Sequence, residues 1–186
     1  MDVEQVVIRP ATEMDLGAIA KVLVDTWRTT FRGRLPDEFL DGLSYSHQEN
    51  RHRRTMSLPG TSYVVAVVEP HQEVVGFANG GPNRQQALPQ AGELYAIYIR
   101  DGWQGRGIGA GMFRAIVAEH QRHGRQSMFA WVLGANPNRS FYERLGGRAS
   151  AERPIVFGPA TVSEVAYVWD DLRLCPGGGP AVAEIR

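Results

Sequence analysis

Cysteine and net charge are both scarce in this sequence. Among its 186 residues Cys175 is the one cysteine, which excludes an internal disulfide and a zinc site built from several cysteines. Lys+Arg and Asp+Glu each number 20, so the formal net charge is zero. Because proteins dedicated to DNA or RNA carry a basic excess that neutralises phosphates, we exclude nucleic acid as a partner.

Long apolar runs are absent as well. No stretch approaches the ~20 apolar residues that cross a bilayer, so we expect no membrane partner. The first residues lack the basic region and the apolar run of a signal peptide. We therefore expect a cytoplasmic protein.

The basic residues are almost all arginine. Lys21 is the only lysine, and because the arginines are spread along the whole chain we attribute the bias to a GC-rich genome. The run from Arg51 to Arg54 is interpreted as a solvated helix face within a neutral domain. His120 and His123 are interpreted in the same way, because no third ligand accompanies them, and we expect no metal.

Composition and periodicity predict one α+β domain. Hydrophobic residues make up 43% and charged residues 22%, as in globular proteins, and we place the domain at residues 1–175. A flexible tail rich in glycine and proline is predicted at residues 176–186. Helices are predicted at residues 13–29, 36–43, 46–57, 112–120 and 138–145, strands at 6–9, 62–68, 74–78, 93–99, 127–133, 148–157 and 162–169, and a loop at 80–92.

A glycine-rich turn is the most informative segment. It comprises Gln104-Gly105-Arg106-Gly107-Ile108-Gly109 and lies between a predicted strand and a predicted helix. Glycines let successive backbone N–H groups converge on one point, and the helix that follows adds the positive end of its dipole. The turn therefore predicts a site for a phosphate or pyrophosphate.

Three phosphate-binding motifs compete for this turn. A Walker loop requires Gly-Lys-Ser/Thr at its end, whereas Ala110 follows Gly109. The dinucleotide fingerprint is met by Gly105, Gly107 and Ala110, but the next strand supplies no acidic residue, so a dinucleotide-dependent oxidoreductase stays a distant alternative. The third motif, Gln/Arg-x-x-Gly-x-Gly/Ala, is met at every fixed position by Gln104, Gly107 and Gly109.

This third motif and its surroundings resemble the GNAT superfamily of bacterial, acetyl-CoA-dependent N-acetyltransferases. Residues 93–99 resemble the family strand that lines the cofactor, and residues 136–147 are similar to its Asn…Phe-Tyr-Glu-x-Leu-Gly-Phe segment. Gly147 departs from that segment, where phenylalanine is usual. Residues 27–40 also resemble an N-terminal pattern of bacterial members, so the resemblance covers residues 6–169.

The resemblance implies a fold and a cofactor site. The expected fold is a layered α/β/α arrangement with a mixed, twisted sheet of six or seven strands, about four helices and two central strands that splay apart. Acetyl-CoA is the expected co-substrate, with pantetheine against the backbone of Ile97 and Ile99 and the pyrophosphate on the glycine-rich turn. The cofactor-binding residues implied are Ile97, Tyr98, Ile99, Gln104, Gly105, Arg106, Gly107, Ile108, Gly109, Ala110, Asn136 and Tyr142.

Two residues are candidates for acid–base chemistry. An alkylammonium with a pKa of ~10 is only about one part in a thousand neutral at pH 7, so a base assists its reaction. Glu93 is the candidate base, and strict alternation along its strand places Glu93, Tyr95, Ile97 and Ile99 on one face. The family places a tyrosine beside the leaving thiol, and Tyr142 matches that position.

The acceptor is the least determined part of the expectation. Trp27, Phe31 and Tyr95 are the candidate substrate contacts. A small-molecule primary amine is the first choice and a protein N-terminal amine the second, with direct transfer in a ternary complex. The alternative from another class is a non-catalytic acetyl-CoA sensor or interaction module. A homodimer is compatible with the family pattern, although no residue of the sequence indicates one.

Overall fold

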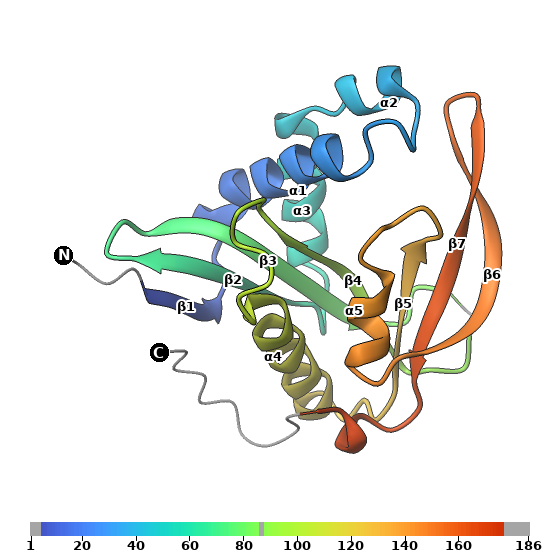
Figure 1. Cartoon of the computed structure of the whole chain (residues 1–186). Coiled ribbons are helices and arrows are strands. Elements are labelled where there is room, and N and C mark those ends of the chain that lie inside the picture. The colour runs from blue at the N-terminus through green and yellow to red at the C-terminus, as the bar shows by residue number, and fades with distance from the viewer. Residues whose placement is uncertain (1–4, 86–87, 177–186) are drawn as a thin grey trace.

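One mixed sheet of seven strands runs through the molecule, and helices cover both of its faces (Figure 1). The computed structural model describes residues 5–85 and 88–176. The strands are β1 (Gln5–Pro10), β2 (Ser62–Glu69), β3 (Glu73–Pro82), β4 (Gly92–Ile99), β5 (Met128–Leu133), β6 (Arg148–Phe157) and β7 (Ala160–Trp169). Their order in the sheet is β1-β2-β3-β4-β5-β7-β6, and β4 and β5 are the parallel neighbours. The predicted α+β fold with a mixed sheet is confirmed.

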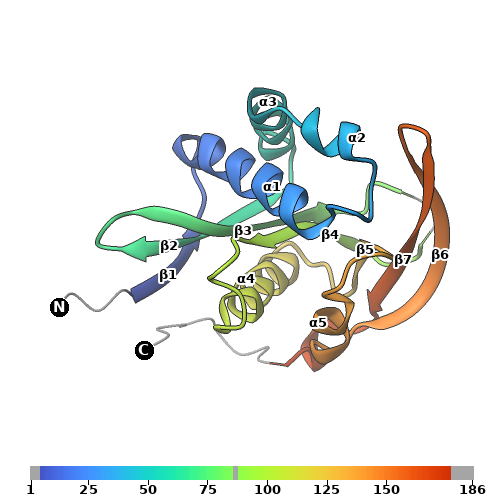
Figure 2. The same ribbon diagram turned by 45° about the horizontal axis from the view of Figure 1, so that its top comes forward.

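The helices form two layers (Figure 2). They are α1 (Leu16–Thr30), α2 (Asp37–Asp41), α3 (Tyr45–Met56), α4 (Ile108–Arg122) and α5 (Arg139–Arg144), with 3₁₀ turns at Glu13–Asp15 and Leu172–Leu174. α1, α2 and α3 cover one face of the sheet, whereas α4 and α5 cover the other. The described chain thus has the five α-helices that the periodicity predicts, where the resemblance implied about four.

Both faces of the central strands are buried because of these two layers. Along β2, Val64 and Ala66 belong to the apolar cluster beneath α4, while Val65 and Val67 belong to the cluster beneath α1. A strand that is covered on both sides requires an unbroken apolar run, and residues 63–68 supply one.

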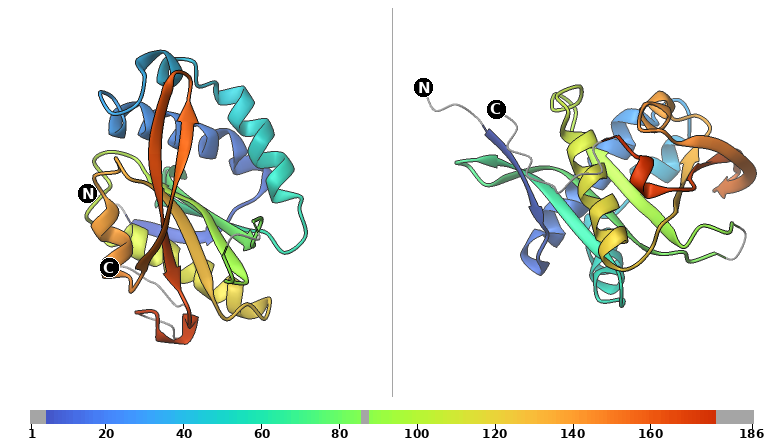
Figure 3. Two further views of the ribbon diagram at one scale, coloured as in Figure 1. Left: turned by 90° about the vertical axis from the view of Figure 1, so that its right-hand side faces the viewer. Right: turned by 90° about the horizontal axis from the view of Figure 1, so that it is seen from below.

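A third apolar cluster joins the α1–α2 segment to the hairpin of β6 and β7. The hairpin of β6 and β7 extends from the sheet toward α2, as the left view of Figure 3 shows. Phe157 of this hairpin packs on Phe39 of α2, with 4.8 Å between ring centroids. The other buried members of the cluster are Phe31, Leu35, Leu40 and Leu133, so the α1–α2 segment packs against the hairpin.

β4 and β5 separate soon after they meet. Only Gly92 pairs with Met128 and Glu93 with Phe129, and the two strands diverge beyond these pairs (Figure 1). The expectation of two splayed central strands is confirmed. The edge of β4 from Leu94 to Ile99 consequently has no strand beside it, and this edge borders the functional site.

Some local expectations were wrong. β3 continues through Pro82, so the loop predicted at residues 80–92 is shorter than expected. His120 is 1% exposed rather than solvated, and Arg125 Nε donates a hydrogen bond to its Nδ1 at 2.8 Å. The predicted tail lies outside the described residues apart from Pro176. None of the described helices combines the length and apolarity required to cross a membrane.

Gly147 stands where the family pattern has phenylalanine, and the structure shows what replaces that side chain. A Cβ at Gly147 would lie 2.7 Å from the indole of Trp169 and 2.9 Å from the carbonyl oxygen of Tyr142. Trp169 is 3% exposed and donates its Nε1–H to Leu145 O at 2.9 Å. The tryptophan of β7 therefore fills the space that a larger side chain at Gly147 would need.

We predict that Gly147→Phe lowers the free energy of unfolding by about 3 kcal/mol, because the added ring collides with Trp169 and with backbone. Urea denaturation measures the change. Gly17→Ala is the control, since a Cβ there meets only Glu49 Oε2 at 3.6 Å, and this substitution in a helix is expected to be neutral or to stabilise by up to ~1 kcal/mol. Equal stability of Gly147→Phe and the wild-type protein would contradict the packing described here.

Candidate functional site

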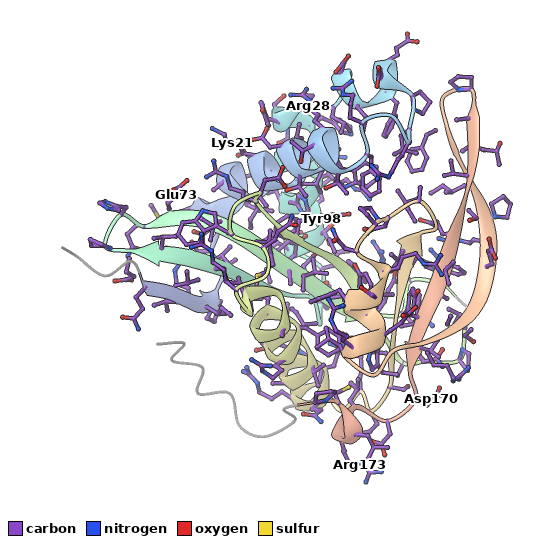
Figure 4. The ribbon with its side chains drawn as sticks, in the orientation of Figure 1. Lys21, Arg28, Glu73, Tyr98, Asp170 and Arg173 are labelled. Atoms are coloured by element: carbon purple, nitrogen blue, oxygen red, sulfur yellow. The ribbon has the colours of Figure 1, made fainter. Side chains whose placement is uncertain are left out.

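Two cavities meet on the open edge of β4. The first has a volume of about 370 Å³ and lies between the end of β4, the glycine-rich turn, α1 and α5; we call it the splay groove, because it borders the edge from which β5 has diverged. The second, of about 560 Å³, lies under α1 and α3 and beside the β6–β7 hairpin; we call it the aromatic cavity. Four residues line both cavities, namely Phe31, Tyr98, Asn136 and Tyr142. Tyr98, labelled in Figure 4, comes from β4 and contacts Trp27 of α1, with 6.5 Å between ring centroids.

The glycine-rich turn forms one end of the splay groove. Gly105 and Gly107 have positive φ angles of 74° and 78°, which residues with a Cβ rarely adopt. Gly107 is the N-cap of α4. No acceptor among the described residues takes a hydrogen bond from the backbone N–H groups of residues 104–110. These donors, together with the positive end of the α4 dipole, form a site for an anion.

Side chains of the turn hold it against β4 and α5. Gln104 Nε2 donates to Ile99 O at 3.0 Å, which ties the turn to the end of β4. A Cβ at Gly109 would lie 3.0 Å from Phe141 and 3.1 Å from Ile99, so α4 can approach both only with glycine there. The turn is thus fixed to the strand edge that forms the wall of the groove.

Two members of the turn do not line the groove with their side chains. Ile108 is 2% exposed and belongs to the apolar cluster beneath α4. The Arg106 guanidinium lies 4.6 Å from the centroid of the Trp103 ring. Gln104, Gly105, Gly107, Gly109 and Ala110 do line the groove, as the resemblance implies.

The backbone of β4 directs polar groups into the groove. The N–H of Arg100 bonds to Val75 O of β3 at 2.8 Å. Because successive residues of a strand direct their backbone groups to opposite edges, those of Ile97 and Ile99 point to the edge where β5 has diverged. The backbone groups of Ile97 and the N–H of Ile99 therefore face the open side of the strand, where Ile99 O already accepts a hydrogen bond from Gln104 Nε2.

A β-bulge in β4 changes which side chains share a face. Asn79 of β3 pairs with Ala96 and Gly80 pairs with Leu94, so Tyr95 is an extra residue without a partner. Such an insertion shifts the alternation of side chains by one residue.

The expectation that Glu93, Tyr95, Ile97 and Ile99 lie on one face was wrong for this reason. Leu94, Ile97 and Ile99 pack on the α4 side of the sheet. Glu93 is adjacent to Leu94 and therefore points to the opposite face, where it lines the aromatic cavity. The bulge thus places the carboxylate of Glu93 on the face opposite Ile97 and Ile99.

Glu93 is a buried, ion-paired carboxylate, 2% exposed. Arg84 Nη2 donates to its Oε1 at 2.6 Å, while Arg84 Nε and the Arg84 backbone N–H each donate to Oε2 at 3.1 Å. Asn83 holds the loop that carries Arg84, because its Nδ2 donates to the carbonyl oxygens of Leu88 and Gln90, both at 2.8 Å. The loop therefore supplies the charge that compensates Glu93.

Tyr142 is buried where the two cavities meet. Its ring stacks on Tyr167, with centroids 5.5 Å apart and an angle of 22° between ring planes. Burial raises the pKa of Tyr142, and the neighbouring Tyr98 and Tyr167 raise it further. Its hydroxyl group consequently stays protonated. Asn136 uses its Oδ1 to accept the N–H of Asn138 at 2.8 Å, and its amide lies at the same junction.

The architecture and the turn agree with a known family. The model of the acetyltransferase (GNAT) family matches residues 21–147. The chain belongs to the acetyltransferase (GNAT) family.

Relatives of this GNAT protein agree with that assignment. The uncharacterized N-acetyltransferase YuaI of Bacillus subtilis is 35% identical over 167 residues, which are 90% of this chain and 94% of YuaI. The PaiA N-acetyltransferase of Thermoplasma acidophilum, in complex with coenzyme A, has a TM-score of 0.65 at 18% identity and covers 86% of this chain and 97% of its own. An N-acetyltransferase of Staphylococcus aureus has a TM-score of 0.67 at 16% identity and covers 90% of this chain and 98% of its own. The two structures are similar in fold.

The three candidate substrate residues of this GNAT protein border the aromatic cavity. Trp27 and Phe31 lie 5.0 Å apart between ring centroids, and the Trp27 Nε1 is buried without a hydrogen-bond partner among the described residues. Tyr95 lies under the Arg84 guanidinium, 3.8 Å from its ring centroid, and its hydroxyl group donates to Pro82 O at 2.7 Å. The Tyr95 hydroxyl group is therefore engaged by the protein itself.

Several residues that line the aromatic cavity belong to no motif, so the sequence analysis did not identify them as site residues. Arg153 and Glu164 form an ion pair across β6 and β7, with 2.8 Å between Nη2 and Oε2. Arg153 also donates to Gln85 of the loop and lies 3.9 Å from the centroid of the Trp131 ring. Strands of a hairpin can be predicted from periodicity, but the cavity that their side chains border depends on how far the hairpin arches over the sheet.

The basic run at residues 51–54 was only partly interpreted correctly. Arg51, Arg53 and Arg54 are exposed, as a solvated helix face requires, whereas His52 is 6% exposed, and Arg51 and His52 line the aromatic cavity. Its Nδ1 lies 3.0 Å from the Tyr63 hydroxyl oxygen. Burial lowers the pKa of His52 to about 4, and the charge of Arg51 contributes to this, so the imidazole is neutral at neutral pH. No cluster of three or more metal-ligand side chains is found in the described part of the chain.

We predict that Arg84→Met lowers the free energy of unfolding by about 3 kcal/mol, because the buried Glu93 loses its cationic partner. The double variant Arg84→Met/Glu93→Gln should recover part of the loss, since no unpaired charge remains. Urea denaturation of the single and double variants measures the coupling.

Arg148→Met is the matched control for this cycle. Arg148 pairs with Asp170, and both side chains are 63% exposed, so we expect a loss of at most ~1 kcal/mol. Equal losses for Arg84→Met and Arg148→Met would show that the Arg84–Glu93 pair is energetically an ordinary surface pair.

Proposed function

We propose that this GNAT protein transfers the acetyl group of acetyl-CoA to a primary amine of a small molecule, by direct transfer in a ternary complex. The observation that carries the proposal is the meeting of the splay groove and the aromatic cavity at Phe31, Tyr98, Asn136 and Tyr142. One cavity has the backbone donors that an extended phosphorylated ligand needs. The other has the volume of a small-ligand site.

The residues of the splay groove fit acetyl-CoA, which supplies the acetyl thioester when it is bound. The free N–H groups of residues 104–110 and the start of α4 suit the two negative charges of a pyrophosphate. The outward backbone groups of Ile97 and Ile99 suit the amides of pantetheine. Arg106 adds positive charge near the turn, and the amide of Asn136 lies where the two cavities meet.

Glu93 is the proposed base. The amine arrives mainly as an ammonium ion and has to lose a proton before its nitrogen can attack a carbonyl carbon. Arg84 engages both carboxylate oxygens of Glu93: Oε2 accepts two hydrogen bonds from it, whereas Oε1 accepts one and keeps a further acceptor position. We propose that Glu93 accepts the proton through a water molecule in the aromatic cavity.

Tyr142 is the proposed donor to the leaving sulfur. Transfer forms an amide bond and breaks a thioester bond, and the thiolate that leaves has to be stabilised and then protonated. A thiol pKa of ~8.5 lies below the raised pKa of Tyr142, so full proton transfer from the tyrosine is uphill. The hydroxyl group therefore acts mainly as a hydrogen-bond donor to developing negative charge.

A covalent acetyl-enzyme on cysteine is disfavoured by the position of Cys175. This residue packs in the cluster beneath α4 and lines neither cavity. Burial, with a contribution from the charge of Asp171, raises the pKa of its thiol to about 11, so the nucleophilic thiolate is scarce at neutral pH. The amine is then left to attack directly.

The acceptor comes from outside the chain. Lys21 lies on α1 (Figure 4) and lines neither cavity.

A protein N-terminal amine remains the second candidate, and a non-catalytic acetyl-CoA sensor the third. The sensor is disfavoured because Glu93 and Tyr142 both face the aromatic cavity. A panel of amines scored by release of the CoA thiol, with mass spectrometry of the product, separates the three. Binding of acetyl-CoA without thiol release from any amine would favour the sensor.

We predict that Gly107→Ala weakens CoA binding about tenfold or more, as measured by calorimetry. The substitution strains a residue at φ 78° and adds a methyl group to the surface of the splay groove. Gly102→Ala is the matched control, because Gly102 has φ 84° and lies outside the groove. The same affinity for both variants would contradict the assignment of the turn to the cofactor.

We predict that Tyr142→Phe lowers kcat by a factor of about 100, because the leaving sulfur loses its donor. CoA affinity and stacking on Tyr167 should be retained, since only the hydroxyl group is removed. Tyr45→Phe is the control: its hydroxyl group donates to Asp25 at 2.6 Å and lies outside both cavities. Full turnover by Tyr142→Phe would remove Tyr142 from the chemistry.

A further inference from the structure

α3 presents a polar face to the aromatic cavity. Gln48, Arg51, His52 and Thr55 follow one another at spacings of three, one and three, which places them on one side of the helix, and all four line the cavity. Gln48 and His52 are 7% and 6% exposed. A helix that packs on a core normally buries apolar residues at such positions. This face of α3 therefore has the composition of a wall that contacts a polar ligand.

Two atoms of this wall are buried without partners. Gln48 Oε1 and His52 Nε2 make no hydrogen bond to any described residue. Buried polar atoms are rarely left unpaired, because each then loses its interaction with water without replacement. Both atoms belong to residues of the cavity wall but are themselves covered, so a ligand or water reaches them only after a side-chain movement in the wall.

The charges around the cavity do not cancel. Its lining holds Arg51, Arg84 and Arg153 together with Glu93 and Glu164. Arg84 neutralises Glu93 at 2.6 Å, and Arg153 neutralises Glu164 at 2.8 Å. Arg51 forms no ion pair and no side-chain hydrogen bond within the described part of the chain. The cavity therefore has one uncompensated guanidinium group, and it lies on the polar face of α3.

The charge of Arg51 acts on the cavity interior. Burial is the main cause of the lowered pKa of His52, and the charge of Arg51 lowers it further. The same charge slightly opposes the rise that burial causes in the pKa values of Tyr63 and Tyr98. Tyr98 also lines the splay groove. The guanidinium group therefore lies within electrostatic range of the place where the two cavities meet.

We propose that the acceptor is a small amine that also carries an anionic group, and that Arg51 and His52 bind this group while the amine lies near Glu93 and Tyr142. A guanidinium group provides paired donors to a carboxylate or a phosphonate, and a neutral imidazole can add a further donor. This inference rests on the proposed function and names its substrate class. Polyamines are disfavoured, because both carboxylates of the cavity are already neutralised by arginine.

Matched pairs of amines test the inference. The wild-type protein with acetyl-CoA is offered phenylalanine, tryptophan, histidine and methionine, each beside its decarboxylated amine, and 1-aminoethylphosphonate beside ethylamine. Release of the CoA thiol gives kcat/KM for each. We expect the preferred pair to favour its acid-bearing member by about tenfold or more, since hydrogen bonds to charged groups are the strong ones.

Two arginine variants assign the preference to α3. Arg51→Gln should reduce the preference to about one, chiefly through KM for the acid-bearing amine, with CoA affinity unchanged. Arg54→Gln makes the same change of charge on the same helix; Arg54 is exposed, as Arg51 is, but lies outside both cavities, so this variant should leave the preference intact. Equal behaviour of the two variants would overturn the role of Arg51.

The remaining outcomes separate this inference from the proposed function. Thiol release with only the decarboxylated amines would leave the proposed function intact and overturn the inference. If no amine releases thiol, calorimetry with CoA-loaded protein decides: tighter binding of the acid-bearing members, lost in Arg51→Gln, supports the inference although turnover fails. Equal binding of both members of each pair, or no binding of either, overturns the inference.

Discussion

The separation of β4 from β5 is the constraint on which the site depends. Two residue pairs hold the strands together, and beyond them β4 has an unpaired edge inside the molecule. Unpaired backbone groups are normally costly when buried, so such an edge requires either water or a ligand with complementary donors and acceptors. The glycine-rich turn is tied by Gln104 to the end of the same strand, so the edge and the turn border one continuous groove.

A single extra residue in β4 distributes the chemistry between two faces of the sheet. Without the bulge at Tyr95, Glu93 would share the α4 face with Ile97 and Ile99. With the bulge, the carboxylate faces the aromatic cavity, while the outward backbone groups of β4 stay at the splay groove. Tyr142 of α5 lines both cavities at the place where they meet. Under the proposed function, the strand serves the cofactor with its edge and the acceptor with its face.

Arginine neutralises the buried acids of the aromatic cavity. Arg84 and Arg153 each bind a carboxylate through a planar group that also stacks on an aromatic ring, Tyr95 in one case and Trp131 in the other. Lysine cannot reproduce this combination of paired donors and a flat face. The scarcity of lysine, first attributed to genome composition, is thus accompanied by structural use of arginine at this cavity. What remains after both pairs are formed is the charge of Arg51.

The sequence by itself determined the α+β class, the glycine-rich turn and the place of Tyr142 in its motif, because these depend on local signals: hydrophobic periodicity, glycines that permit positive φ, and a contiguous motif whose family resemblance also implied the splayed sheet. It could not determine the face on which Glu93 lies, since one unpaired residue in β4 reverses the alternation and only pairing with β3 reveals it. Nor could it place Arg84, His52 or Arg153 around one cavity. These residues come from a loop, a helix and a hairpin, and only the packing of the α1–α2 segment against the β6–β7 hairpin brings them together.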